Sequence, residues 1–311
     1  MRRQIPALSA LLVVAAVLCV LPFIVSDYNL SLAAQVGIFF IGILGLNILT
    51  GYTGQISIGH GAFMAIGGYT TAVMSRDHHT NLVVTMLMAF AICFVVGLIV
   101  GLPALRLSGV YLALVTFALA VSVPQLPLQY STFLGGSGGV QSHRTVGNLW
   151  VYTAAWVCSA VLFVLAWLIL RGRLGRAFRA VRDSEIAAVA SGVELPIYKT
   201  LAFGISAAYA GVAGSLFVLA ANGFAQPSEF DVFLSLQLLV GAAVAGLGSL
   251  WGILAGAAFV GLLPQVSTSV PVIGAQHGRD VVFGAAVILV MLLLPDGFAG
   301  LLTRLRRLAR A

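Results

Sequence analysis

The sequence predicts an all-α polytopic integral membrane protein with about ten transmembrane helices, within a range of about 8 to 11. Of its 311 residues, 60% are hydrophobic and only 8% are charged, whereas a soluble domain carries about a quarter charged residues. Apolar runs of about 20 residues, the length that crosses the hydrocarbon core as a helix, recur along the whole chain. Its arginines gather in a few loops, as expected where one side of a membrane retains them.

The apolar runs set the order of the expected spans. Residues 6 to 26 follow a basic start, but the run is too long for the apolar core of a secretion signal, so we expect an uncleaved first span. A second run, residues 59 to 75, is short and rich in glycine. The other runs are ordinary spans: residues 30–50, 82–102, 109–128, 149–170, 200–222, 232–248, 249–266 and 280–298.

The distribution of basic residues predicts the orientation, because cytoplasmic loops retain Lys and Arg. With both termini cytoplasmic, 13 basic residues fall inside and 3 outside. Without the short span at 59–75, every later loop would change sides, so the charge count supports that span. The inner residues are Arg2, Arg3, Arg106, Arg171, Arg173, Arg176, Arg179, Arg182, Lys199, Arg304, Arg306, Arg307 and Arg310, and the outer ones are Arg76, Arg144 and Arg279.

Several function classes find no support in these residues. The net charge of +7 comes from loops between spans, not from the basic face of a folded domain that nucleic-acid binding requires. The phosphate-binding loop of ATPases needs a Gly-Lys pair, but the only lysine, Lys199, follows Tyr198. The acidic residues lie in loops or at span ends, so neither a proton relay nor a membrane enzyme is indicated. We therefore expect no catalytic residue, metal or cofactor, and a passive channel or a chain powered by another subunit.

The longest predicted cytoplasmic loop, residues 171–199, lies within a single transmembrane domain of residues 1–311. Good helix formers around Arg179, Arg182 and Asp183 lead to Glu185-Ile186-Ala187-Ala188, and Gly192 then provides a helix stop. The arginines alone indicate a positive-inside anchor. The small residues beside them favour docking of a soluble partner on a short helix.

The stretch GYTGQISIGHGAFMAIGGY, residues 51–69, lies between two strongly apolar segments and is rich in glycine and polar residues. Glycine lets a membrane helix break where protein or a water-filled cavity satisfies the backbone. We interpret Asn47, Gly51, Gln55, Ser57 and His60 as a possible gate or part of a translocation path. The alternative is a plain cytoplasmic turn whose polar side chains contact water.

Two sets of spaced glycines predict close helix packing, because small residues four apart share one helical face. The first set is Gly97 and Gly101. The second is Gly248, Gly252 and Gly256. We expect packing within this chain or against a partner chain, and no ligand role.

Four blocks in order resemble the membrane permeases of branched-chain amino acid ABC importers, most closely the LivM-type subunit. They are GYTGQISIGHGAFMAIGGYTTA, LPALRLSGVYLALVTFALA, GRAFRAVRDSEIAAVASGVELPIYKTLAFGISAAYAGVAGSLF and VAGLGSLWGILAGA. In that family a cytoplasmic helix with a Glu-Ala-Ala-like core and a downstream glycine sits in a cleft of the ATPase. Glu185, Ala187, Ala188 and Gly192 match that pattern here, with Ile186 inserted.

The resemblance implies a permease subunit of an ATP-driven importer in the bacterial plasma (inner) membrane, with ATP bound by its partners. It implies a homologous second permease, two cytoplasmic ATPase subunits and an external solute-binding protein. The expected solutes are branched-chain or related small amino acids and amides. The alternative function is a passive channel or facilitator for a small neutral solute such as urea.

Overall fold

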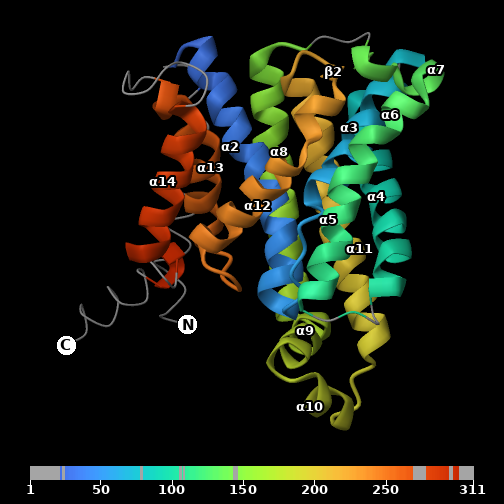
Figure 1. Ribbon diagram of the computed structural model, residues 1–311, viewed down its shortest axis with the longest axis vertical. Coiled ribbons are helices and arrows are strands. Elements are labelled where there is room, and N and C mark those ends of the chain that lie inside the picture. The colour runs from blue at the N-terminus through green and yellow to red at the C-terminus, as the bar shows by residue number, and fades with distance from the viewer. Residues whose placement is uncertain are drawn as a thin grey trace.

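A computed structural model describes residues 22, 25–77, 80–104, 107, 109–142, 146–268, 278–293 and 297–300, and these are almost entirely helical. Long helices run roughly side by side, with α9 and α10 at one end and α6, α7 and β2 at the other (Figure 1). The elements are α2 Asp27–Leu46, η1 Asn47–Tyr52, α3 His60–Asp77, α4 Leu82–Ala104, α5 Val110–Ser122, η2 Val123–Gln125, α6 Leu126–Gln129, α7 Ser131–Leu134, η3 Gly136–Gly138, β1 Val140–Gln141, α8 Asn148–Arg171, α9 Arg173–Asp183, α10 Glu185–Ala190, α11 Leu195–Ala220, β2 Phe224–Ala225, η4 Pro227–Phe230, α12 Val232–Ala245, α13 Ile253–Thr268 and α14 Gly278–Leu293.

The predicted apolar runs become helices, which confirms an all-α polytopic membrane protein. Six stretches of the described chain are long and apolar enough to cross a bilayer: 27–52, 82–103, 110–129, 148–171, 195–220 and 227–245. The run at 109–128 is α5 followed by η2 and α6, because Pro124 and Pro127 lie where one straight helix would need their missing N–H groups. The total of ten spans and the sides of the termini stay predictions. Most of the expected first span, 6–26, lies outside the described residues, as do Arg106 and Arg144.

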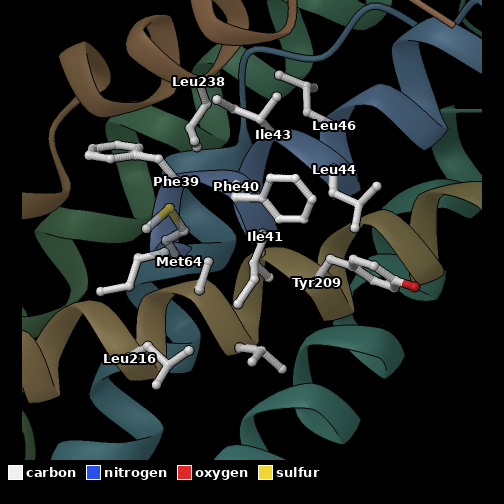
Figure 2. Packing of buried hydrophobic residues seen from close by; sticks show 14 of the residues in the cluster. Phe39, Phe40, Ile41, Ile43, Leu44, Leu46, Met64, Tyr209, Leu216 and Leu238 are labelled. Atoms are coloured by element: carbon white, nitrogen blue, oxygen red, sulfur yellow. The ribbon is translucent and has the colours of Figure 1, made fainter. Parts of the chain in front are cut away.

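Helices α2 and α11 form the centre of the protein, and the other long helices pack around them. Most of α11 is buried by α4, α3 and α2. Figure 2 shows where α2 and α11 meet: Ile41 and Leu44 face Tyr209 and Leu216, with Met64 of α3 beside them. The Tyr209 hydroxyl donates a hydrogen bond to the carbonyl of Leu162 in α8, 2.9 Å away, so this large side chain is buried with its polar end satisfied.

The close approach of α4 to α11 depends on Gly97 and Gly101. A Cβ atom at Gly97 would lie 2.5 Å from the Cβ of Ala207, and one at Gly101 would lie 3.3 Å from the Cα of Thr200. Further along the same contact, Gly211 of α11 leaves equally little room against Cys93 of α4. Helix backbones therefore approach one another at these glycines, which is the packing that small residues permit in membrane proteins.

The prediction of a single glycine face at 248–256 is wrong. Gly248 and Gly252 lie in the loop between α12 and α13, and only Gly256 is helical. Gly248 has a φ of 79°, a left-handed conformation that other residues adopt at a cost. Here the four-residue spacing reflects a tight reversal of the chain. Gly252 and Gly256 still pack closely, against the backbone carbonyls of Ala245 and Gly241 in α12.

Candidate functional site

The helix that begins as α2 changes its form at Asn47 and then stops. Residues 47–52 form the π-helix η1, residues 54–59 are not helical, and α3 begins at His60. A π-turn widens the helix and is frequently found at functional positions. Gly54 has a φ of 73°, so glycine suits the point where the chain leaves η1. The expected interruption is therefore built from one wide helical turn and one non-helical segment.

The four polar side chains predicted to form a gate or path are buried: Asn47, Gln55, Ser57 and His60. The plain-turn alternative expected these groups to contact water, and the structure contradicts that part of it. Gln55 folds back on η1. Its side-chain Nε2 donates to the Thr53 hydroxyl at 3.0 Å, and its backbone carbonyl accepts from the Thr50 hydroxyl. Whether the stretch opens as a gate stays a prediction.

His60 joins three helices through one hydrogen-bonded chain. The Ser206 hydroxyl of α11 donates to the carbonyl of Gly45 in α2 at 2.6 Å, and it lies 2.6 Å from His60 Nε2. Because the serine hydrogen is directed to Gly45, the imidazole must donate from Nε2, which leaves a lone pair on Nδ1. Nδ1 has no partner among the described groups. Within the described ranges no cluster of three or more His, Cys, Asp or Glu could hold a metal.

The predicted cytoplasmic loop forms two helices, where a single short helix was expected. Helix α9 packs on the body of the protein through Phe178 and Val181, which are buried. Two of its arginines donate to backbone carbonyls: Arg179 Nη1 to Leu170 at 3.2 Å and Arg182 Nη1 to Gly51 at 3.1 Å. Helix α9 is thereby fixed to the end of α8 and to η1.

Helix α10 projects further from the protein, at the lower end of the view in Figure 1. Ser184 caps the start of α10 by accepting from the Ala187 N–H. The extended backbone of the same residue separates α10 from α9. Gly192, with a φ of 81°, ends it: the N–H groups of Gly192 and Val193 bond the carbonyls of Val189 and Ala188. This is a Schellman ending, so the prediction of a helix stop at Gly192 is confirmed.

One ion pair holds α10 against α11. Glu185 Oε1 lies 2.6 Å from Lys199 Nζ, and the lysine is buried whereas the glutamate is half exposed. The side chains that α10 turns outward are apolar: Ile186 is 86% exposed and Val189 is 55% exposed. Exposed apolar side chains three positions apart are also a feature of helices that bind in a partner's groove.

Some of the expected docking residues are free to contact a partner, and others contact the protein itself. Asp183, Glu185, Ala187 and Gly192 are exposed, whereas Ala188 is buried against the protein. Arg179 and Arg182 bond to the protein's own backbone, so these arginines hold α9 in place. Sequence reasoning missed Ile186 and Val189 as the outward face and Lys199 as the partner of Glu185. Three-residue spacing of the two apolar side chains is the signal that could have found them.

The loop between α12 and α13 meets η1 at the same place. Asn47 Nδ2 donates to the carbonyl of Ser249 at 2.8 Å, and Asn47 Oδ1 accepts from the N–H of Gly248 at 2.8 Å. Both ends of one amide are thus used on two consecutive residues. Together with Arg182 and Gly51, these residues form a contact that we call the junction: Asn47, Gly51, Arg182, Gly248 and Ser249.

Comparison with known proteins agrees with this architecture. Residues 28–292 match the sequence profile of a family described as "Branched-chain amino acid transport system / permease component". The chain is 29% identical to the high-affinity branched-chain amino acid transport system permease protein LivM of Salmonella typhimurium, over 93% of this chain and 73% of that protein. LivM of Escherichia coli is also 29% identical, over 89% and 71%. The permease protein LivH of Escherichia coli is 24% identical, over 83% and 89%.

No solved structure gives a significant match. The family match nevertheless covers most of the chain, and it includes η1, the two loop helices and the loop between α12 and α13. The chain therefore belongs to the branched-chain amino acid transport system permease family.

Proposed function

We propose that this chain is a permease subunit of an ATP-driven importer for branched-chain or related small amino acids and amides. The sequence offers no nucleotide-binding loop, so the ATP would be bound and hydrolysed by separate subunits. The observation that carries the proposal is helix α10, which presents Ile186 and Val189 outward while Glu185 and α9 fix it to the permease. A passive channel has no need of such a surface.

The same reasoning gives the proposed partners. The chain is similar to proteins named LivM and to proteins named LivH, which supports pairing with a homologous second permease. Two ATPases would dock on the α10 ends of the pair, and an external solute-binding protein would deliver the amino acid. In this proposal α9 and α10 face the cytoplasm of a bacterial inner membrane.

The apolar character of the chain suits an aliphatic substrate. We assign the break at η1 and residues 54–59 to the translocation path, because buried polar groups and non-helical backbone there require partners that only protein or a lined cavity supplies. Buried Asn47, Gln55, Ser57 and His60 are the residues proposed to line or control it.

Reconstituted vesicles test the proposal. The permease pair and the ATPases are placed in proteoliposomes with ATP inside, and the solute-binding protein and labelled leucine are added outside. We expect leucine to accumulate above its external concentration only with ATP and with the ATPases present. If leucine or urea instead equilibrated across the membrane in the absence of both ATP and the ATPases, the result would support the channel alternative and exclude the importer.

A further inference from the structure

We infer that Arg182 transmits the movement of α9 to the permease through the junction, and that Asn47 passes it on to the loop between α12 and α13. Arg182 is in this view a positioning residue: its Nη1 donates to Gly51 of η1, although the side chain is still 38% exposed. The inference rests on the proposed function, since it concerns how ATPase closure reaches the path. It assigns new roles to Gly51, Gly248 and Ser249 as well.

The first link is the guanidinium of Arg182. Asp183 accepts from its Nε and Nη2 at 3.1 and 3.0 Å, which orients the planar group. Nη1 is then directed at the carbonyl of Gly51, 3.1 Å away. The two residues are 131 positions apart in the chain, so this bond ties α9 directly to the π-helix. A charged donor on a carbonyl is stronger than a neutral hydrogen bond and more directional than apolar packing.

The second link is the absence of side chains where the three segments meet. A Cβ on Gly51 would overlap Asn47 Oδ1 and the N atom of Gly248. On Gly54 it would lie 3.3 Å from Cγ of Arg182, and on Gly248 it would lie 3.0 Å from Nη1 of Arg182. Glycine at these positions brings α9, η1 and the α12–α13 loop into backbone contact, so a displacement of one displaces the others.

The third link is the side-chain amide of Asn47. It donates to Ser249 and accepts from Gly248, both at 2.8 Å, from the first residue of η1. The loop that it holds joins α12 to α13, and the start of α12 contacts the start of α3 through Ser235, whose hydroxyl accepts from the Gly61 N–H at 2.9 Å. Contacts at the two ends of α12 therefore connect α9 to both sides of the break at residues 54–59.

The element that changes form in this account is η1, which the junction holds at both ends. A π-turn has one residue more than an α-turn and is frequent at functional sites, so a shift of its hydrogen bonds would give the α form. An element with two discrete arrangements is what converts a small displacement into a switch. Arg182 holds η1 at Gly51, near its end, whereas Asn47 is its beginning, so the two side chains act on opposite ends of the wide turn.

The experiment has two readouts and uses the reconstituted importer together with the purified permease pair. The variants are Arg182→Gln, which removes the charge, and Asn47→Asp, which keeps the acceptor for Gly248 but loses the donor to Ser249. Arg173→Gln is the matched control, because Arg173 is an exposed arginine on the same helix. The readouts are the ATP hydrolysed per leucine imported and the hydrogen exchange of residues 246–252.

We expect both variants to raise the ATP hydrolysed per leucine by about tenfold. Arg182→Gln loses a hydrogen bond of a charged group, and Asn47→Asp loses a neutral one and places a carboxylate against the Ser249 carbonyl. ATP hydrolysis itself should continue, and the control should keep the wild-type ratio. Combining the two substitutions should add little, because they act in series. Exchange at residues 246–252 should accelerate in Arg182→Gln and stay unchanged in Arg173→Gln.

A wild-type ratio in either variant would overturn the inference, as would a joint loss of hydrolysis and import in assembled complexes, which would place Arg182 in docking. If Arg182→Gln does not assemble, Asn47→Asp decides the matter by the same ratio. The exchange measurement needs no ATPase, so unchanged exchange in Arg182→Gln overturns the inference even where the ratio of ATP to leucine rises. Absence of ATP-dependent uptake in the wild type would instead remove the proposed function.

Discussion

Replacing Ile186 by alanine tests whether α10 is a docking surface. The change removes three carbon atoms from a side chain that is 86% exposed in the free subunit. Burial on a partner is worth about 0.8 kcal/mol per carbon, so about 2 kcal/mol of binding free energy is lost if Ile186 is covered. That loss corresponds to roughly thirtyfold weaker binding of the ATPase. The permease itself should keep its stability, because an exposed substitution typically changes it by about 0.5 kcal/mol or less.

The assay is titration of purified ATPase onto the permease pair in lipid nanodiscs, with the dissociation constant as readout. Ile197→Ala is the matched control: this isoleucine is also more than half exposed, but it lines an apolar groove with Leu98 and Leu102 between α4 and α11. We expect the control to bind the ATPase as the wild type does. Binding of Ile186→Ala within twofold of wild type, or an equal loss in both variants, would refute the reasoning.

Two further experiments test the packing and the ion pair. Gly211→Ala should lower the free energy of unfolding by about 1 to 3 kcal/mol, because its Cβ would lie 2.6 Å from Cys93 Sγ. Gly284→Ala is the control and should leave stability unchanged, since a Cβ there meets nothing within 4 Å. Equal melting temperatures of the two variants in detergent would contradict this prediction. A double-mutant cycle with Glu185→Gln and Lys199→Met should give a coupling energy of about 1 kcal/mol in thermal unfolding, since one partner is buried and the other half exposed. A coupling energy near zero would show that the pair does not hold α10.

The sequence predicts the long helices well because their length and composition are local properties. The predicted run at 149–170 becomes α8, Asn148–Arg171, and the run at 82–102 becomes α4, Leu82–Ala104. Gly192 was also predictable as a helix stop. A glycine in the left-handed conformation caps a helix through hydrogen bonds to residues only a few positions earlier, so the signal is local. In each of these cases the deciding interactions lie within one turn or one span of the chain.

The candidate site was predictable only in part, because its contacts join distant segments. Asn47 is about 200 positions from its partners in the α12–α13 loop. No local sequence pattern predicts a contact between residues so far apart. The glycine repeat misled for the same reason: the spacing of Gly248 and Gly252 fits a helical face, but the left-handed φ of Gly248 belongs to a reversal of the chain. Side-chain direction, too, requires the fold. Arginines that looked like an anchor or a docking surface turn out to bond η1 and α8.

Cysteine labelling at position 186 tests the central claim most directly. In a variant whose own cysteines are replaced, Ile186→Cys is treated with a membrane-impermeant maleimide. The control is Ser228→Cys, an exposed position three residues after β2, which lies at the end opposite α10 in Figure 1. We predict that position 186 reacts only in inside-out vesicles and is protected when the ATPase is added, while position 228 reacts only in intact cells whose outer face is accessible. Reaction of position 186 from outside the cell, or unchanged reaction in the presence of bound ATPase, would contradict the account.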